Sequence, residues 1–136
     1  MLTYREILVA IDCSEVDAII INHVSALALQ LGATLNLLHV VHSHTLDQDR
    51  YLREQSLAIL ERYRNKLEAK GIETRIIIRS GEPEHEILRE IEENVYDLLA
   101  MATHGHRLPE RILFGSVSRS LRQNIPIPLL LIQPEH

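Results

Sequence analysis

The sequence is poor in cysteine, in basic residues and in long hydrophobic runs, and each shortage excludes a class of protein. Its one cysteine, Cys13, cannot form an internal disulfide, which favours a reducing compartment. The chain starts MLTYREILVAID, with charged residues followed by only a short apolar run, so its start predicts neither a secretion signal nor a membrane span. We therefore expect a cytoplasmic protein with no membrane partner.

Basic residues are in the minority and are scattered along the chain. There are 14 Lys and Arg against 19 Asp and Glu, which gives a formal net charge of −5. Nucleic-acid binding depends on clustered basic residues, so we expect no nucleic-acid partner. Apolar residues, in contrast, make up 46% of the 136 positions. Because a globule of this size buries roughly two-thirds of its unfolded surface, this supply predicts a single domain over residues 1–136.

Short apolar runs alternate with segments of helical periodicity along the chain. The run at 7–11 is typical of a strand buried on both faces, and residues 16–31 have apolar positions at helical spacing. The expected strands are 7–11, 33–41, 72–78, 97–102 and 127–132. This alternation predicts an α/β fold, a single doubly wound five-stranded parallel sheet with helices on both faces, as in Rossmann-like proteins.

Capping and stop residues predict where several helices begin and end. Ser14 with Asp17 three residues later predicts an N-cap pair for the first helix, and Gly32 predicts its C-terminal stop. Pro83 is expected at the first position of the third helix, whose buried face is expected to include Val95.

Three loops that leave the carboxyl ends of strands carry unusual residues, at 12–14, 39–44 and 103–118. In parallel sheets, ligands bind beyond these ends where the strand order reverses. The last loop has Gly105, then Gly115 and Ser116 where a helix begins. A helix N-terminus favours an anion, and glycine lets a phosphate approach the backbone. Taken alone, however, Gly115 is better explained as a hinge and Ser116 as an ordinary N-cap. Neither GxGxxG after the first strand nor a Walker lysine is present.

These features resemble the universal stress protein family over essentially the whole chain. The matching segments are ILVAIDCSE, LLHVV, GEPEHEIL and, most specifically, DLLAMATHG followed after nine residues by GS. The family's nucleotide signature is a glycine, two residues, a second glycine, nine residues, then glycine with serine or threonine. Gly105, Gly115 and Ser116 fit this signature, whereas Ala102 stands at the first glycine and Pro109 lies in the loop.

The resemblance implies an adenine nucleotide alpha hydrolase-like fold that binds ATP, with or without Mg²⁺. Adenine is expected beside Asp12 and the backbone of Val40, although Asp12 is equally expected to cap the first helix. The ribose and phosphates are expected along the loop after the fourth strand. The cofactor-binding positions are Ala10, Asp12, Val40, Ala102, Gly105, His106, Arg107, Gly115, Ser116, Val117 and Ser118.

The last strand is expected at an edge of the sheet, where unpaired backbone groups invite another chain. Universal stress proteins typically dimerise by pairing this strand with its copy. The resemblance therefore implies a homodimer through Leu129, Leu130, Leu131 and Ile132.

Three functions remain open from the sequence. The first is a nucleotide-dependent regulatory dimer of the stress response, and the second is an interaction module without nucleotide, which Ala102 and the HRLPER loop favour. The third is a slow ATP hydrolase, for which His104, His106 and Glu110 are the candidates to position water. We assign no catalytic residue. A flavodoxin-like carrier is disfavoured because the chain has no Trp and one Phe.

Two His-x-His pairs, His42 with His44 and His104 with His106, follow strands. A zinc site would need three or four converging ligands, and the alternative is that these rings contact phosphate, water or solvent. We assign no metal site. Cys13 is expected to be a small buried residue, because no Lys or His flanks it to lower the pKa of its thiol.

Overall fold

The computed structural model describes residues 2–103 and 119–133 of the chain. Its strands are β1 (Glu6–Ala10), β2 (Thr34–Val41), β3 (Thr74–Ser80), β4 (Leu98–Ala102) and β5 (Leu129–Ile132). The helices between them are α1 (Asp17–Leu31), α2 (Leu46–Ala69) and α3 (Pro83–Glu93). Residues 119–124 form a further helical segment before β5.

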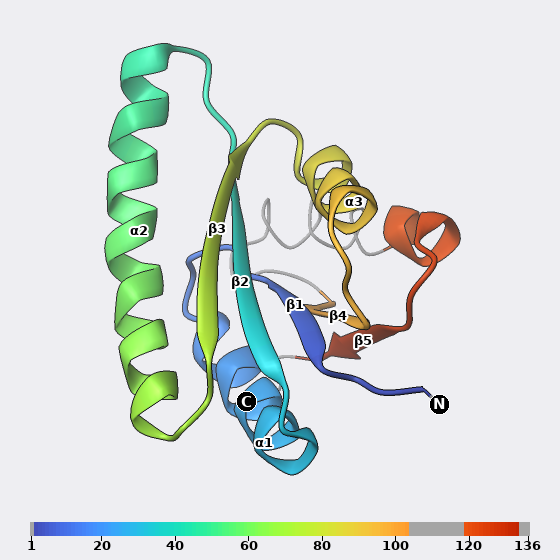
Figure 1. The fold of residues 1–136 in the computed structure, drawn as a ribbon. Coiled ribbons are helices and arrows are strands. Elements are labelled where there is room, and N and C mark those ends of the chain that lie inside the picture. The colour runs from blue at the N-terminus through green and yellow to red at the C-terminus, as the bar shows by residue number, and fades with distance from the viewer. Residues whose placement is uncertain (1, 104–118, 134–136) are drawn as a thin grey trace.

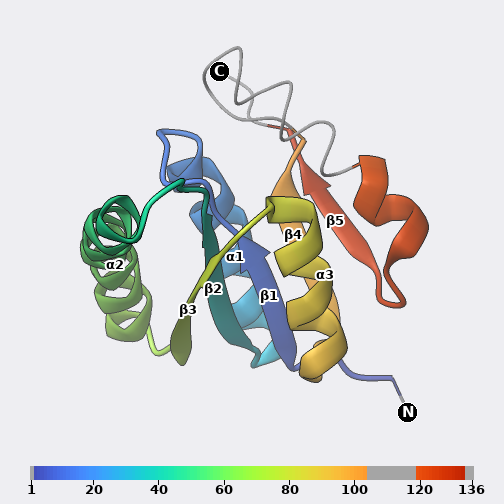
Figure 2. The ribbon, with the colours of Figure 1, turned by 90° about the horizontal axis from the view of Figure 1, so that it is seen from above.

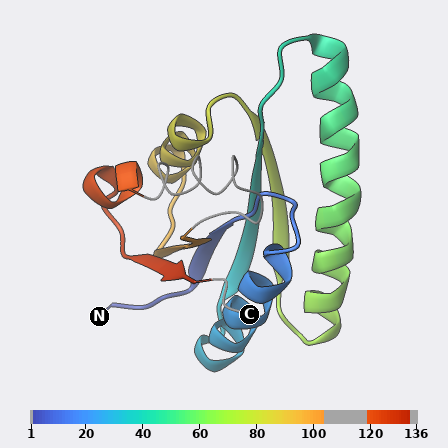
Figure 3. The same ribbon diagram turned by 180° about the vertical axis from the view of Figure 1, so that it is seen from behind.

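The five strands form one parallel sheet in the order β3-β2-β1-β4-β5 (Figure 1). The chain builds outward from β1 to β3 and then returns to the other side of β1 for β4. Helices α1 and α3 therefore lie on opposite faces of the sheet, as Figure 2 shows. Helix α2 runs alongside β2 and β3 (Figure 3). The predicted doubly wound α/β fold is confirmed, and β5 lies at an edge as expected.

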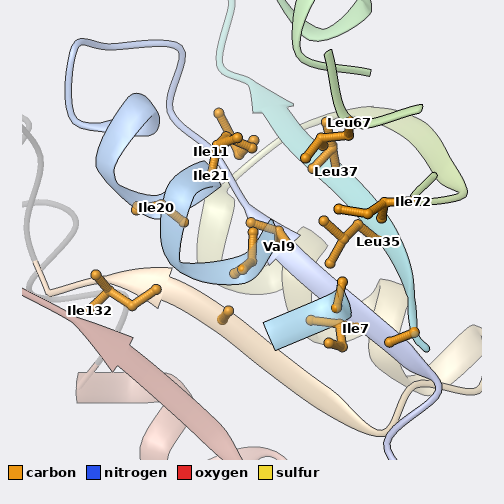
Figure 4. Close-up of a cluster of buried hydrophobic side chains, with 14 of the residues drawn as sticks. Ile7, Val9, Ile11, Ile20, Ile21, Leu35, Leu37, Leu67, Ile72 and Ile132 are labelled. Carbon is orange, nitrogen blue, oxygen red and sulfur yellow. The ribbon is translucent and has the colours of Figure 1, made fainter. Parts of the chain in front are cut away.

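Alternate residues of the central strands pack on opposite faces of the sheet. Ile7 and Val9 of β1 join the core beneath α1 and α2, whereas Leu8 and Ala10 join the core beneath α3. Figure 4 shows the first of these clusters, in which Leu67 of α2 packs toward the sheet. This double burial is why the central strands read as continuous apolar runs.

Several predicted helix ends are confirmed. Gly32 ends α1 with a left-handed φ of 67°, and its N–H donates to the carbonyl of Ala28. Pro83 stands in the first turn of α3. The start of α2, for which the sequence predicted no cap, is capped by the hydroxyl of Thr45, which accepts the N–H of Gln48 at 3.1 Å. None of the described helices is long and apolar enough to cross a lipid bilayer.

Two predictions about helix positions are wrong, and each has a local reason. Val95 is 83% exposed rather than buried, because α3 ends at Glu93 and Asn94 is extended. Ser14 and Asp17 do not form an N-cap pair, because Val16 is the N-cap residue and α1 begins at Asp17, two residues later than expected. The side chains of these two residues instead take part in the loop described below.

The last strand is shorter than predicted because proline lacks a backbone donor. Pro128 can accept the N–H of Leu99 at 3.0 Å but has no N–H to return to β4. The ladder therefore begins at Leu129, and at its end the N–H of Thr103 donates to Ile132.

Candidate functional site

The strand order reverses between β1 and β4, and this places the candidate site at their carboxyl ends. From β1 the chain passes to β2 on one side, whereas β4 lies on its other side. The N–H of Ile11, just past β1, donates to the carbonyl of Leu38 in β2 at 2.9 Å. The residues that follow β1, β2 and β4 therefore lie together at the carboxyl ends of the strands, the location where such folds bind ligands.

The loop after β1 is organised by the carboxylate of Asp12. Asp12 Oδ1 accepts both the backbone N–H of Ser14, at 3.0 Å, and the Ser14 hydroxyl. Ser14 Oγ in turn accepts the N–H of Val16 at 3.3 Å. Cys13 between them has a φ of 63°, a conformation uncommon for residues other than glycine. Asp12 thus organises the loop before α1 but does not cap the helix as expected, because the N-cap residue is Val16 and no side chain caps it.

Asp17 is a member of this site that sequence reasoning missed. Its side chain is 1% exposed, and its Oδ1 accepts the backbone N–H of Asp12 at 3.3 Å. Burial above all, and then the charge of Asp12, raise the pKa of Asp17 to about 9. The sequence carries no signal for this burial, because an aspartate near a serine at a helix start is ordinarily an exposed capping residue.

Cys13 and His39, two further titratable residues near Asp12, do not have the properties of a nucleophile or a metal ligand. Burial raises the pKa of the Cys13 thiol to about 12, with a further contribution from Asp17, so the thiol stays protonated at neutral pH. Burial also lowers the pKa of His39. The Nδ1 of this neutral ring lies 2.8 Å from the carbonyl oxygen of Ile11, which can only accept, so Nδ1 carries the proton.

The aliphatic residues predicted for the site divide between the two faces of the sheet. Ala10 is buried beneath α3, and Val40 is partly buried against the same cluster. Ala102 is fully buried in the cluster on the α1 side. The methyl group that replaces the first glycine of the signature therefore lies in the core rather than on the exposed edge.

Polar contacts hold the loop after β2 to the end of β3. Asp49, in the first turn of α2, accepts the hydroxyls of Ser80 and Ser43 and the Nε–H of Arg53. These hydrogen bonds lower the pKa of Asp49, with Ser80 the largest cause. Arg53 also donates to Ser80, so the contacts form a closed cluster.

The first His-x-His pair lies in this loop and its rings touch each other. The ring centroids of His42 and His44 are 5.4 Å apart, edge to face, and His42 Nδ1 lies 3.6 Å from Glu82. Within residues 2–103 and 119–133, no three His, Cys, Asp or Glu side chains are grouped to hold a metal ion.

The phosphate side of the predicted site lies outside the described residues. This applies to Gly105, His106, Arg107, Gly115, Ser116, Val117 and Ser118, and equally to His104, Pro109 and Glu110. The described residues thus include the side expected for adenine, formed by β1 and β2, and the last residues of β4.

Comparisons with known proteins agree with this geometry. The model of the universal stress protein family matches residues 3–133. Universal stress protein YxiE of Bacillus subtilis is 29% identical over 147 aligned residues, covering 96% of this chain and 99% of its own. The solved structure of the hypothetical protein MJ0577 superposes with a TM-score of 0.86 at 26% identity, covering 99% of both chains. A universal stress protein from Archaeoglobus fulgidus, solved in complex with dAMP, has a TM-score of 0.72 at 19% identity and covers 96% of this chain and 99% of its own.

Proposed function

The chain belongs to the universal stress protein family, and from this premise we propose that it is a dimeric regulatory protein that binds an adenine nucleotide, with ATP as the leading candidate. The observation that carries the proposal is the reversal of strand order between β1 and β4, with the loop of Asp12 at that edge. The Archaeoglobus fulgidus neighbour that binds dAMP adds support, because its fold is the same.

The position of Ala102 favours nucleotide binding over the alternative of a module without nucleotide. Ala102 departs from the glycine signature, and a methyl group projecting from the sheet edge would have obstructed the ligand. Its side chain is instead fully buried on the α1 side. The alanine at the first glycine position therefore takes no space from the carboxyl ends of the strands, where the nucleotide is expected.

Nucleotide binding is tested by thermal and chemical unfolding in the presence of ATP, ADP, AMP and dAMP, with GTP as the control that differs from ATP in its base. A ligand at 100 times its dissociation constant stabilises a protein by about 2.7 kcal/mol. We expect stabilisation by the adenine nucleotides and a weaker effect of GTP. If millimolar concentrations of all four adenine nucleotides leave unfolding unchanged, the proposal is wrong. Mass spectrometry of small molecules released from freshly purified, denatured protein gives an independent identification.

The two edges of the sheet differ, and the difference supports dimerisation through β5. The edge strand β3 carries Arg75 and Arg79, both in ion pairs with carboxylates, and charged side chains of this kind protect an edge from pairing. The edge strand β5 has only aliphatic side chains, and three of the four are partly exposed. We therefore expect the pairing of two copies to use β5.

Backbone geometry identifies which residues of β5 would pair with a second copy. The carbonyls of Pro128 and Ile132 accept N–H groups from β4, so the even-numbered residues face β4. Leu129 and Leu131 consequently direct their N–H and C=O groups to the free edge. Leu131→Pro removes one outward N–H without breaking the β4 ladder, since proline is tolerated at such positions.

We expect the native protein to be a dimer by light scattering and Leu131→Pro to be a monomer. Leu131→Thr is the matched control, because it keeps the N–H and suits a strand, and it is expected to remain dimeric. A native monomer at micromolar concentration, or a dimer that survives Leu131→Pro, would show that this edge is not the interface.

A further inference from the structure

Asp12 and Asp17, here called the carboxyl pair, leave two buried oxygen atoms without partners. Asp12 Oδ1 is occupied by Ser14, and Asp17 Oδ1 by the N–H of Asp12. The Oδ2 atoms of both residues are buried, and neither has a hydrogen-bond partner among the described residues. Buried polar atoms are almost always satisfied, so this double exception needs an explanation.

A single proton explains both unpartnered atoms. Two ionised carboxylates can only accept hydrogen bonds, so neither could satisfy the other, and a second buried charge without a partner would be very costly. When one carboxyl is protonated, its O–H becomes a donor to the other Oδ2. Asp17 is the better bearer of the proton because it is almost fully buried, whereas Asp12 is only half-buried. The raised pKa of Asp17 agrees with this assignment.

The groups that surround the carboxyl pair do not offer it a positive charge. Cys13 in the loop, His39 on β2, and Ser56 and Tyr63 on α2 are the neighbours that interact with the pair or with one another. Burial lowers the pKa of His39 and raises the pKa values of the Cys13 thiol and of Tyr63. Arg62 acts on Tyr63, but within the described ranges no Lys, Arg or His forms an ion pair with either carboxyl group.

We propose that Asp12 and Asp17 share one buried proton, with Asp17 as the donor, and that this hydrogen bond positions the Asp12 carboxylate beside the nucleotide site. The positioning part rests on the proposed function, whereas the shared proton does not. Asp17 is on this account a positioning residue. It turns one oxygen of Asp12 inward, leaves the pair with a single negative charge, and keeps the loop of Ser14 in its observed conformation.

The shared proton is tested without nucleotide, by urea unfolding of the native protein and Asp17→Asn between pH 5 and 8. Unfolded aspartate has lost its proton in this range, whereas folded Asp17 keeps it. For each unit of increasing pH, the unfolding equilibrium constant of the native protein should therefore rise by a factor about ten times larger than that of Asp17→Asn. Asp49→Asn is the matched control, because the lowered pKa of Asp49 leaves it ionised in both states, and it should keep the native slope. Equal slopes for the native protein and Asp17→Asn would overturn the proposal.

If Asp17→Asn does not fold, the NMR chemical shift of the Asp17 carboxyl carbon in the ¹³C-labelled native protein tests the shared proton instead. We expect its chemical shift at pH 7 to be that of a protonated acid. The shift of a carboxylate at pH 7 would overturn the proposal.

The positioning part is tested by calorimetry with ATP at pH 7. Asparagine can donate to Asp12 Oδ2 and accept from the Asp12 N–H, so Asp17→Asn should bind within about twofold of the native affinity. Asp17→Ala provides neither group, and its affinity should fall by tenfold or more. Native affinity in Asp17→Ala would overturn the positioning role. If the native protein binds no adenine nucleotide, the positioning role fails together with the proposed function, and the pH slopes still decide the shared proton.

Discussion

Arg79 is the most informative single position for the stability of this fold, because it joins β3 to α3 through three carboxylates. Its Nε donates to Glu86 at 2.9 Å, and its Nη1 donates to Glu90 at 2.8 Å and to Glu93 at 3.2 Å. The glutamate side chains are 12%, 6% and 52% exposed, in that order. These contacts raise the pKa of Arg79 and, through Arg79 above all, lower the pKa of Glu86.

We expect Arg79→Met to destabilise the protein by about 3 kcal/mol. Removing one partner of a buried ion pair typically costs about 3–5 kcal/mol, because the remaining charge is uncompensated. The lower value applies here because Glu86 keeps a contact with Arg89 at 3.4 Å, and Glu90 keeps hydrogen bonds from Asn94 and Tyr96.

Urea unfolding of Arg79→Met and of the control Glu93→Gln measures this difference. Glu93 is half-exposed, so its substitution should change the free energy of unfolding by less than about 1 kcal/mol. Adding Glu86→Gln and Glu90→Gln to Arg79→Met should restore much of the loss, since the buried charges are then gone. A loss below about 1 kcal/mol in Arg79→Met would refute the reasoning, as would an equal loss in the control.

The same residues predict a pH dependence. Arg79 lowers the pKa of Glu86 in the folded state, so the stabilisation is complete above the ordinary pKa of glutamate. It is lost as the pH falls through the lowered value. The difference in stability between the native protein and Arg79→Met should therefore shrink on acidification below about pH 4, near the usual glutamate pKa.

Three further predictions concern local structure. Gly81→Ala should cost more than Gly32→Ala by urea unfolding, because an added Cβ at Gly81 would lie 3.0 Å from a glutamate side chain of α3, whereas nothing lies within 4 Å at Gly32. Thr45→Ala should cost about 1 kcal/mol by removing the N-cap of α2, and Thr45→Ser should recover most of it. Asp97→Ala should cost about 1–3 kcal/mol, because its carboxylate accepts two backbone N–H groups at the start of β1, and faster amide exchange of those two groups would show where the loss occurs.

Periodicity was sufficient to predict the order of strands and helices, and the errors arose where the local backbone ended an element that the apolar pattern would have continued. Val95 continues the apolar spacing of α3, but Asn94 leaves the helical conformation before it. Pro128 follows an apolar residue in the expected strand, but it cannot donate to β4, so the strand begins later. Neither event changes the sheet order, because that order depends on the buried strands and their crossovers.

The candidate site was predictable in its location but not in its hydrogen bonding. Asp12 at the end of β1 follows from the break in the first apolar run. The burial of Asp17 does not follow, because an aspartate near a serine at a helix start is ordinarily an exposed capping residue. Only the three-dimensional structure shows that Asp17 is almost fully buried and that its Oδ1 accepts the N–H of Asp12.

The proposed site has two parts with different physical requirements. On the side where we propose that adenine binds, the loop of Asp12 follows β1, and the aliphatic residues Ala10 and Val40 belong to one cluster. The carboxyl pair adds negative charge there, which disfavours a phosphate close by. Under the proposed function, we therefore expect the charge of Asp12 and Asp17 to place the base at the β1–β2 side and the phosphates away from it, toward the exit of β4.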